Sequence, residues 1–182
     1  VTYYRQFFPE NRDWYYPFSM DNMIKQWHSI ERVWHYMDDR PHNYTRVGLF
    51  RIDLLYTDPI DISSGTDAVF PYFVTASIRG RFKFMNDRMF YGSYENGKHW
   101  AADRFSSVAK YLEHEDEYWP PYLHSEIYLG WLFRNTPVEL QLLCGMRVRA
   151  TGEVLDDCEK NRDPLKLARL EVQRWIRNYF LQ

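Results

Sequence analysis

Cysteine is scarce in this chain of 182 residues, which contains only Cys144 and Cys158. Two cysteines exclude a disulfide framework and a cysteine-rich zinc site. One disulfide between them stays open, although we expect a buried thiol at Cys144 because that residue falls in a predicted strand. No apolar run is long enough to span a bilayer, and no stretch has the pattern of a signal peptide.

Net charge is also nearly absent. The formal value of -2 gives no electrostatic reason to expect nucleic acid or an anionic membrane as the main partner. Aromatic residues, by contrast, make up 19% of the chain and apolar residues 45%, which is typical of a globular protein with an aromatic core and aromatic pocket walls. The length suits a single domain over residues 1–182.

The stretch 47–56 is the centre of the pattern. Eight of its ten residues are apolar or glycine without a helical period, and turn-forming residues follow at 57–59. This predicts a strand buried on both faces, as in the middle of a parallel sheet. Arg51 and Asp53 interrupt it two residues apart, so a strand would place both on one face near its carboxyl end, where α/β sheets bind ligands. A cation and a carboxylate at this position could bind a phosphate, a metal or both. The alternative is an ion pair between Arg51 and Asp53 that only stabilises the local structure.

Hydrophobic periodicity elsewhere predicts an α/β domain with a mixed sheet. Residues 1–18 form an irregular lead-in, and Ser19 or Asp21 is the expected N-cap of the first helix. The segment 74–84 is either a mobile loop that offers cations to a diphosphate or a solvated hairpin. The predicted elements are a helix over 21–37, strands over 47–56, 67–73 and 89–91, helices over 96–113 and 123–133, a strand over 138–151 and a helix over 163–182.

Polar residues stand at two further junctions. Asn86 and Asp87 directly precede the strand at 89–91, where they would contact a substrate or cap a turn. Gly92 in the same region would permit a close backbone approach. Glu126 falls in the first turn of the helix over 123–133, where the helix dipole favours a carboxylate for stability alone.

No dinucleotide-binding, Walker-type, nucleophile-elbow or zinc-protease motif is present. Three segments taken together (46–61, 86–92 and 123–129) nevertheless resemble GT-A-like nucleotide-diphospho-sugar transferases of the kind encoded by chloroviruses and their uncharacterised eukaryotic relatives. The resemblance covers about residues 20–152. It implies a GT-A-like mixed sheet flanked by helices. It also implies transfer of a sugar from a nucleotide-diphosphate donor, with a UDP-sugar as first choice, to a hydroxyl of a glycan or another acceptor.

The resemblance also implies site residues. Asp53 matches the last carboxylate of the Asp-any-Asp motif that holds Mn²⁺ or Mg²⁺ in GT-A enzymes, whereas Arg51 stands in the first position. Either Asp53 holds the metal with help from waters, phosphates and His124, or Arg51 itself neutralises the leaving diphosphate. Asn86 and Arg88 complete the donor-binding set.

Glu126 is the expected general base if the enzyme inverts, and Asp87 is the second choice. If the enzyme retains configuration, these carboxylates orient the substrates instead.

One structural element that is typical of GT-A domains is not found in this sequence. GT-A domains begin with a strand and turn that help to hold the nucleotide base, and none is found before residue 20. Either the chain is a fragment, or residues 1–18 supply a degenerate version. Two alternatives stay open: a non-catalytic sugar- or nucleotide-binding relative, and a metal-dependent phosphate hydrolase that uses Asp53, Asp87, His124 and Glu126. The compartment, cytoplasmic or Golgi-luminal, is not indicated.

Overall fold

A computed structural model describes residues 1–9, 15–39, 43–72, 77–79, 82–114, 119–120, 122–143, 145–149 and 151–156. The elements within these residues are the 3₁₀ helix η1 (Thr2–Phe7), α1 (Phe18–Asp38), β1 (Arg46–Phe50), β2 (Leu54–Tyr56), β3 (Ala68–Tyr72), β4 (Ser77–Arg79), β5 (Phe82–Phe84), β6 (Met89–Ser93), α2 (Tyr94–Ala101), α3 (Asp103–Ser106), α4 (Val108–Leu112), α5 (Ser125–Leu132), β7 (Glu139–Leu142), β8 (Gly145–Val148) and β9 (Val154–Asp156). The predicted α/β class is confirmed.

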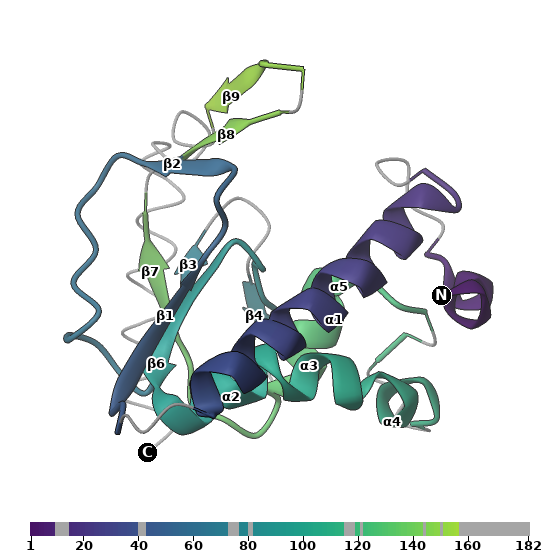
Figure 1. Cartoon of the computed structure of the whole chain (residues 1–182), viewed down its shortest axis with the longest axis horizontal. Helices are drawn as coiled ribbons and strands as arrows, with labels where there is room; N and C mark the ends of the chain where they lie inside the picture. The colour runs from purple at the N-terminus through teal and green to yellow at the C-terminus, as the bar shows by residue number, and fades with distance from the viewer. Residues whose placement is uncertain are drawn as a thin grey trace.

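Four of the described strands form a mixed sheet in the order β1-β6-β3-β7. The strand β6 runs antiparallel to both of its neighbours, whereas β3 and β7 are parallel. A second sheet, of β2, β8 and β9, lies beyond one end of the first, and the helices gather on the opposite side of the molecule from the loop after β2 (Figure 1). The mixed sheet is therefore confirmed at this level of detail.

The central strands β3 and β6 bury side chains on both faces, because successive residues of a strand point in opposite directions. Phe70 and Phe90 face the helices, where they pack edge to face with each other at 5.3 Å between ring centroids. Val69, Met89 and Tyr91 form a smaller core on the other face. The aromatic richness of the sequence thus serves the core, as predicted.

The prediction of one central buried strand over 47–56 is wrong. The chain turns at residues 51–53, so that β1 and β2 belong to different sheets. Moreover, β1 is an edge strand that pairs only with β6 among the described strands, and Phe50 at its end is 42% exposed. An unbroken apolar run cannot reveal a turn of this kind, because both short strands need apolar residues.

Other element boundaries also differ from the prediction. The helix expected over 96–113 is three short helices, α2 to α4, and the strand expected over 138–151 is β7 and β8 in separate sheets. Neither Ser19 nor Asp21 is the N-cap of α1, because that helix begins at Phe18 after Pro17.

Two other predictions agree with the structure. The helix expected over 123–133 is confirmed as α5. Of the two alternatives for 74–84, the hairpin agrees with the antiparallel pairing of β4 and β5, whereas its exposure to solvent stays untested. The predicted helix over 163–182, Cys144 and Cys158 lie outside the described residues.

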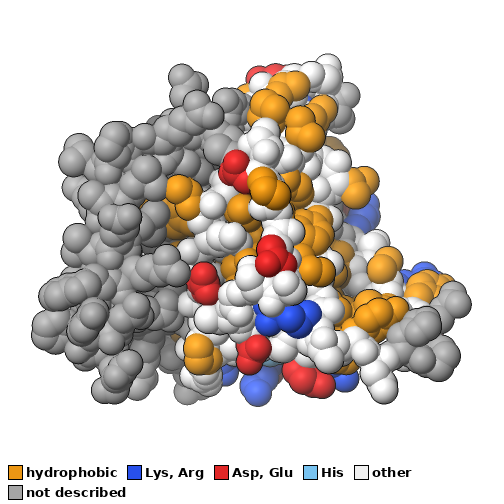
Figure 2. Space-filling model, turned by 90° about the vertical axis from the view of Figure 1, so that its left-hand side faces the viewer, with side chains coloured by type: hydrophobic (Ala, Val, Ile, Leu, Met, Phe, Trp, Pro, Cys, Tyr) orange, Lys and Arg blue, Asp and Glu red, His pale blue; other side chains and the backbone are white. Residues whose placement is uncertain are grey.

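Exposed hydrophobic side chains gather on one surface of the protein. Figure 2 views the side of the molecule that carries the loop after β2, and orange side chains run down its centre. Among the described residues, Leu55 on β2, Val148 on β8 and Val154 on β9 are each 44–55% exposed. The small second sheet therefore has an apolar outer surface.

Candidate functional site

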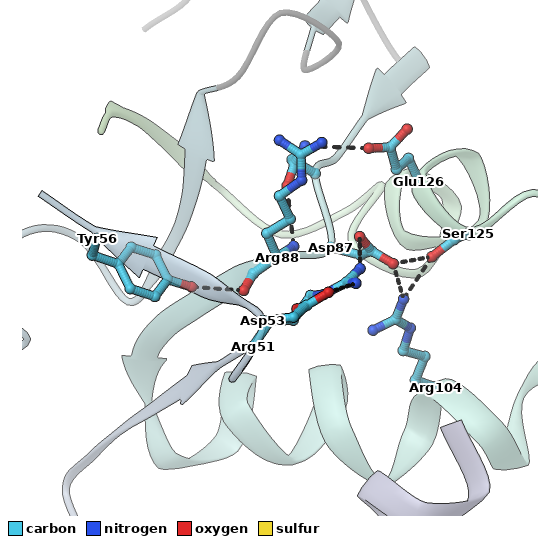
Figure 3. A network of polar contacts seen from close by, with 9 residues as sticks. Arg51, Asp53, Tyr56, Asp87, Arg88, Arg104, Ser125 and Glu126 are labelled. Atoms are coloured by element: carbon cyan, nitrogen blue, oxygen red, sulfur yellow. Dashed lines mark hydrogen bonds and ion pairs between the residues drawn. The ribbon is translucent and has the colours of Figure 1, made fainter. Parts of the chain in front are cut away.

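Three segments that are distant in sequence meet at one polar cluster. Arg51 and Asp53 lie in the turn after β1, Asn86 to Arg88 lie in the loop before β6, and Ser125 and Glu126 open α5 (Figure 3). These are the three segments that carry the resemblance described above. The structure therefore brings the predicted site residues into one neighbourhood, at the C-terminal end of β1.

The Arg51 guanidinium forms a two-pronged pair with Asp53. Its Nε donates to Oδ1 at 2.8 Å and its Nη2 donates to Oδ2 at 2.6 Å. The third nitrogen, Nη1, lies 3.7 Å from the carboxylate of Asp87. Hydrogen bonding to Arg51 lowers the pKa of Asp53, and the same bond raises the pKa of Arg51. The two side chains lie side by side as predicted, but a turn rather than a strand places them there.

Asp87 is the centre of the cluster. The hydroxyl of Ser125 donates to its Oδ2 at 2.6 Å, and Nη2 of Arg104 lies 3.4 Å from the same oxygen. Burial acts to raise the pKa of Asp87, but the guanidiniums of Arg104 and Arg51 outweigh it and hold that pKa below its usual value. Asp87 is therefore an ionised carboxylate bound between two arginines.

Arg104 is a site residue that the sequence analysis did not find. It is 1% exposed and lies between the rings of Trp27 and Trp100, with its Cζ 4.9 and 4.8 Å from their centroids. Burial lowers its pKa to about 10. One signal was present: Arg104 occupies the apolar stripe of its helical region, four residues from both Trp100 and Val108. A charge in such a stripe indicates a buried partner.

Asn86 joins the loop to α5. It is fully buried, and its Nδ2 donates to Oε1 of Glu126 at 3.2 Å, while its Oδ1 accepts from the backbone N–H of Arg88 at 3.0 Å. The second bond is an Asx turn, which is the structural role that the sequence left open. The Arg88 side chain points toward Glu126 (Figure 3), and its carbonyl oxygen accepts from the backbone N–H of Arg51 at 3.1 Å.

His124 lies directly before α5, against the ring of Phe84 at 5.6 Å. Burial lowers the pKa of His124, although the Asp87 carboxylate acts in the opposite direction. The imidazole is therefore part of the same buried neighbourhood.

The expected divalent metal does not fit the donor set. Among the described residues, no group of three or more His, Cys, Asp and Glu side chains could hold a metal ion. Both carboxylate oxygens of Asp53 already accept from Arg51, and two cations flank Asp87. Mg²⁺ is usually held by one or two carboxylates with waters and substrate phosphates, but each oxygen of Asp53 and Asp87 already lies beside an arginine nitrogen.

A cavity of about 670 Å³ adjoins the cluster, between α1 and the end of β1. Arg51 and Asp53 belong to its lining, and most of the other lining residues are apolar. The remaining described lining residues are Gln26, Ser29, Ile30, Val33, Trp34, Met37, Leu49, Phe50, Ile52 and Trp100. An apolar cavity lined by a few polar groups is the usual form of a small-molecule site.

Comparison with known proteins shows no family. No family model matches the chain, and no curated protein matches it. Within the described part of the chain, every helix is too short or too polar to cross a membrane. What the structure defines is an α/β protein in which a cluster of paired charges stands beside an apolar cavity.

Proposed function

We propose that this protein is a glycosyltransferase that moves a sugar from a nucleotide-diphosphate donor to a hydroxyl acceptor, on a GT-A-like fold. The observation that carries the proposal is the meeting of residues 51–53, 86–88 and 125–126 in one cluster. Residue type and position single out polar residues in each segment, and the resemblance to such transferases groups the three segments into one site. Their proximity in the fold supports this grouping.

The chemistry assigns a role to each charge. Departure of a nucleoside diphosphate needs positive charge at its oxygens, and Arg51 and Arg88 can supply it from two adjacent segments. In this scheme Asp53 holds the Arg51 fork in position and does not serve as a metal ligand.

Glu126 is the proposed general base for an inverting reaction. Asp87 is a poorer base, because the two guanidiniums that lower its pKa also reduce its affinity for a proton. For a retaining reaction, both carboxylates orient the substrates.

Calorimetric titration with UDP tests the donor site. We expect binding in EDTA, little gain from Mn²⁺, and a loss of at least about tenfold in Arg51→Ala, which corresponds to roughly 1.4 kcal/mol. Arg5 offers a matched control, because it forms the same two-pronged pair with Asp21 at 2.9 and 2.5 Å on a distant part of the chain. Arg5→Ala should leave UDP affinity unchanged.

Two results would overturn the donor-site assignment. One is the absence of binding to UDP and to other nucleoside diphosphates, with or without Mn²⁺. The other is an equal loss of binding in Arg5→Ala and Arg51→Ala, which would indicate a general loss of structure. Binding that requires Mn²⁺ and vanishes in Asp53→Ala would instead restore the metal-dependent scheme.

A non-catalytic relative is the second candidate. The occupation of both Asp53 oxygens by Arg51 favours it, since the carboxylate is not free for a metal. Incubation with UDP-glucose and UDP-galactose, followed by chromatography for released UDP, separates the two functions. UDP release that falls in Glu126→Gln supports an enzyme, whereas donor binding without release supports the binding relative. No observation on the described residues favours the phosphate hydrolase.

A further inference from the structure

The cavity beside the cluster is apolar along the helix side. Residues at helical spacing on α1 line it: Ile30, Val33 and Met37 lie on one stripe, next to Trp34. The first half of α1 uses Met23, Ile24 and Trp27 to pack into the core. The second half therefore presents a further apolar surface, in which Val33 is 65% exposed.

The opposite wall comes from the end of β1 and the turn after it. Leu49, Phe50 and Ile52 contribute apolar side chains, and Ile52 is fully exposed. Arg51 and Asp53 alternate with these residues and bring charge to the same wall. The cavity is thus polar where it meets the proposed donor site and apolar over most of its remaining lining.

This distribution of polarity constrains the ligand. A sugar or an oligosaccharide needs hydrogen-bond partners for its hydroxyls, and burial of a hydroxyl without a partner is unfavourable. Apart from Arg51 and Asp53, the described lining offers only Gln26 and Ser29 as polar side chains. A hydrocarbon or aromatic body, by contrast, gains about 25 cal/mol for each Å² of apolar surface that it buries.

We propose that the cavity binds the hydrophobic body of the acceptor, an amphiphilic alcohol whose hydroxyl end enters the charged cluster past Arg51 and Asp53, toward Glu126 in the same cluster. The identification of this ligand as the acceptor rests on the proposed transferase function. The preference for a ligand with a hydrophobic body rests on the lining alone. Two observations favour this occupant: Arg51 and Asp53 belong both to the charged cluster and to the cavity lining, and eight of the other ten described lining residues are apolar.

Titration with n-octyl β-D-glucoside, below its micelle concentration, tests the proposal on the full chain. Glucose provides the head group without the hydrophobic body. Val33→Glu and Ile52→Glu place a charge in the cavity at exposed positions, so folding should tolerate them. Tyr36→Glu on α1 and Leu55→Glu on β2 are matched controls, because both residues are exposed, at 63% and 55%, and neither is among the lining residues.

We expect octyl glucoside to bind with an affinity at least about tenfold above that of glucose, and each cavity variant to lose about tenfold or more. The two control variants should change the affinity by less than about twofold. UDP affinity should be the same in Val33→Glu as in the wild type. Tryptophan fluorescence should report the ligand, since Trp34 and Trp100 line the cavity.

Three outcomes would overturn the proposal. Octyl glucoside does not bind, or the cavity variants and the control variants lose equal affinity for it. The third is competition between UDP and octyl glucoside, which would assign the cavity to the nucleotide. A wild-type dimer that Val33→Glu dissociates, with no amphiphile binding, would identify a second copy as the occupant. If the amphiphile binds as expected but no nucleoside diphosphate does, the transferase proposal fails while the hydrophobic site stands.

Discussion

The hydroxyl of Ser125 donates a 2.6 Å hydrogen bond to the carboxylate of Asp87, across 38 residues of sequence. The same hydroxyl oxygen accepts from Nη2 of Arg104 at 2.8 Å. One small side chain in the first turn of α5 therefore joins the loop before β6 to a buried arginine in α3. The candidate site depends on this junction, because Asp87 also contacts Arg51.

Removal of the Ser125 hydroxyl should weaken the junction. Ser125→Ala deletes a hydrogen bond to a charged group that is mostly buried, and we expect a loss of about 2 kcal/mol in the free energy of unfolding. Urea denaturation measures it. Ser106→Ala is the control, because Ser106 is exposed and, as far as the described residues show, its hydroxyl donates only to two backbone carbonyls, at 3.4 Å. A loss in Ser125→Ala no greater than in Ser106→Ala would contradict the role given to Ser125.

Arg104 and Asp87 should be strongly coupled. Removal of one partner of a buried ion pair leaves an uncompensated charge, so Arg104→Met should cost roughly 3–5 kcal/mol of unfolding free energy. The double variant Arg104→Met, Asp87→Asn should cost clearly less than the sum of the two single changes. A double-mutant cycle from urea denaturation measures this coupling, and additive effects would show that the pair is energetically independent.

Arg134 provides a comparison for the aromatic contacts of Arg104. Its Cζ lies 4.2 Å from the centroid of Trp131 and its Nη1 donates to the Trp131 carbonyl at 2.8 Å, but the residue is partly exposed and forms no ion pair with another described residue. Arg134→Met should therefore cost about 1 kcal/mol or less. A similar cost for the two arginine variants would mean that the ring contacts of Arg104 matter more than its contact with Asp87.

The sequence predicted the members of the site better than their geometry. Arg51, Asp53, Asn86, Asp87 and Glu126 were selected for residue type and position, and the structure places them together. The turn at residues 51–53 could not be predicted, because Ile52 is apolar yet fully exposed and interrupts no hydrophobic pattern. Local sequence carries no information about which sheet each half of the run joins.

Contacts between residues that are distant in the sequence could not be predicted either. Helical periodicity across residues 96–113 is continuous, yet the helix is interrupted at Ala102 and Ser107, so that three short helices result. Arg104 in the second of these helices lies against Trp27 of α1, a residue 77 positions earlier in the sequence (104 − 27). The apolar stripe over residues 96–113 indicated which helix face is buried. Only the tertiary structure shows that the carboxylate of Asp87 compensates the charge of Arg104.

Gly92 was predicted to allow a close backbone approach, and the structure agrees. A Cβ atom at this position would lie 2.1 Å from the carbonyl oxygen of Asp67, which accepts from the backbone N–H of Ser93 at 2.9 Å. Gly92→Ala should therefore push two backbone segments apart and cost about 3 kcal/mol of unfolding free energy.

Gly152 separates this steric effect from a purely conformational one. It has a φ of +83° and no atom within 4 Å of a Cβ position, so Gly152→Ala should cost only about 1 kcal/mol. Urea denaturation of both variants makes the comparison. A cost for Gly92→Ala equal to or below that for Gly152→Ala would show that the strand shifts without strain.

Stability should fall in acid, in part through the site itself. The pKa values of Asp87 and Asp53 lie below the ordinary 3.8 in the folded protein, so the unfolded chain binds more protons as pH falls through that range. Their stabilising contribution is complete well above pH 3.8 and is lost as pH falls below 3.8 toward the folded pKa values. The free-energy difference between wild type and Asp87→Asn should therefore be largest near pH 7 and shrink from about pH 4 downward.

Urea denaturation at pH 7, 5, 4 and 3 measures this difference. Asp39→Asn serves as the control, since Asp39 is exposed at the C-terminal end of α1. A constant difference between wild type and Asp87→Asn across the four pH values would mean that the arginines do not hold Asp87 ionised. The cluster would then lack the fixed negative charge of Asp87 beside Nη1 of Arg51, and Asp53 alone would hold that guanidinium in the proposed donor site.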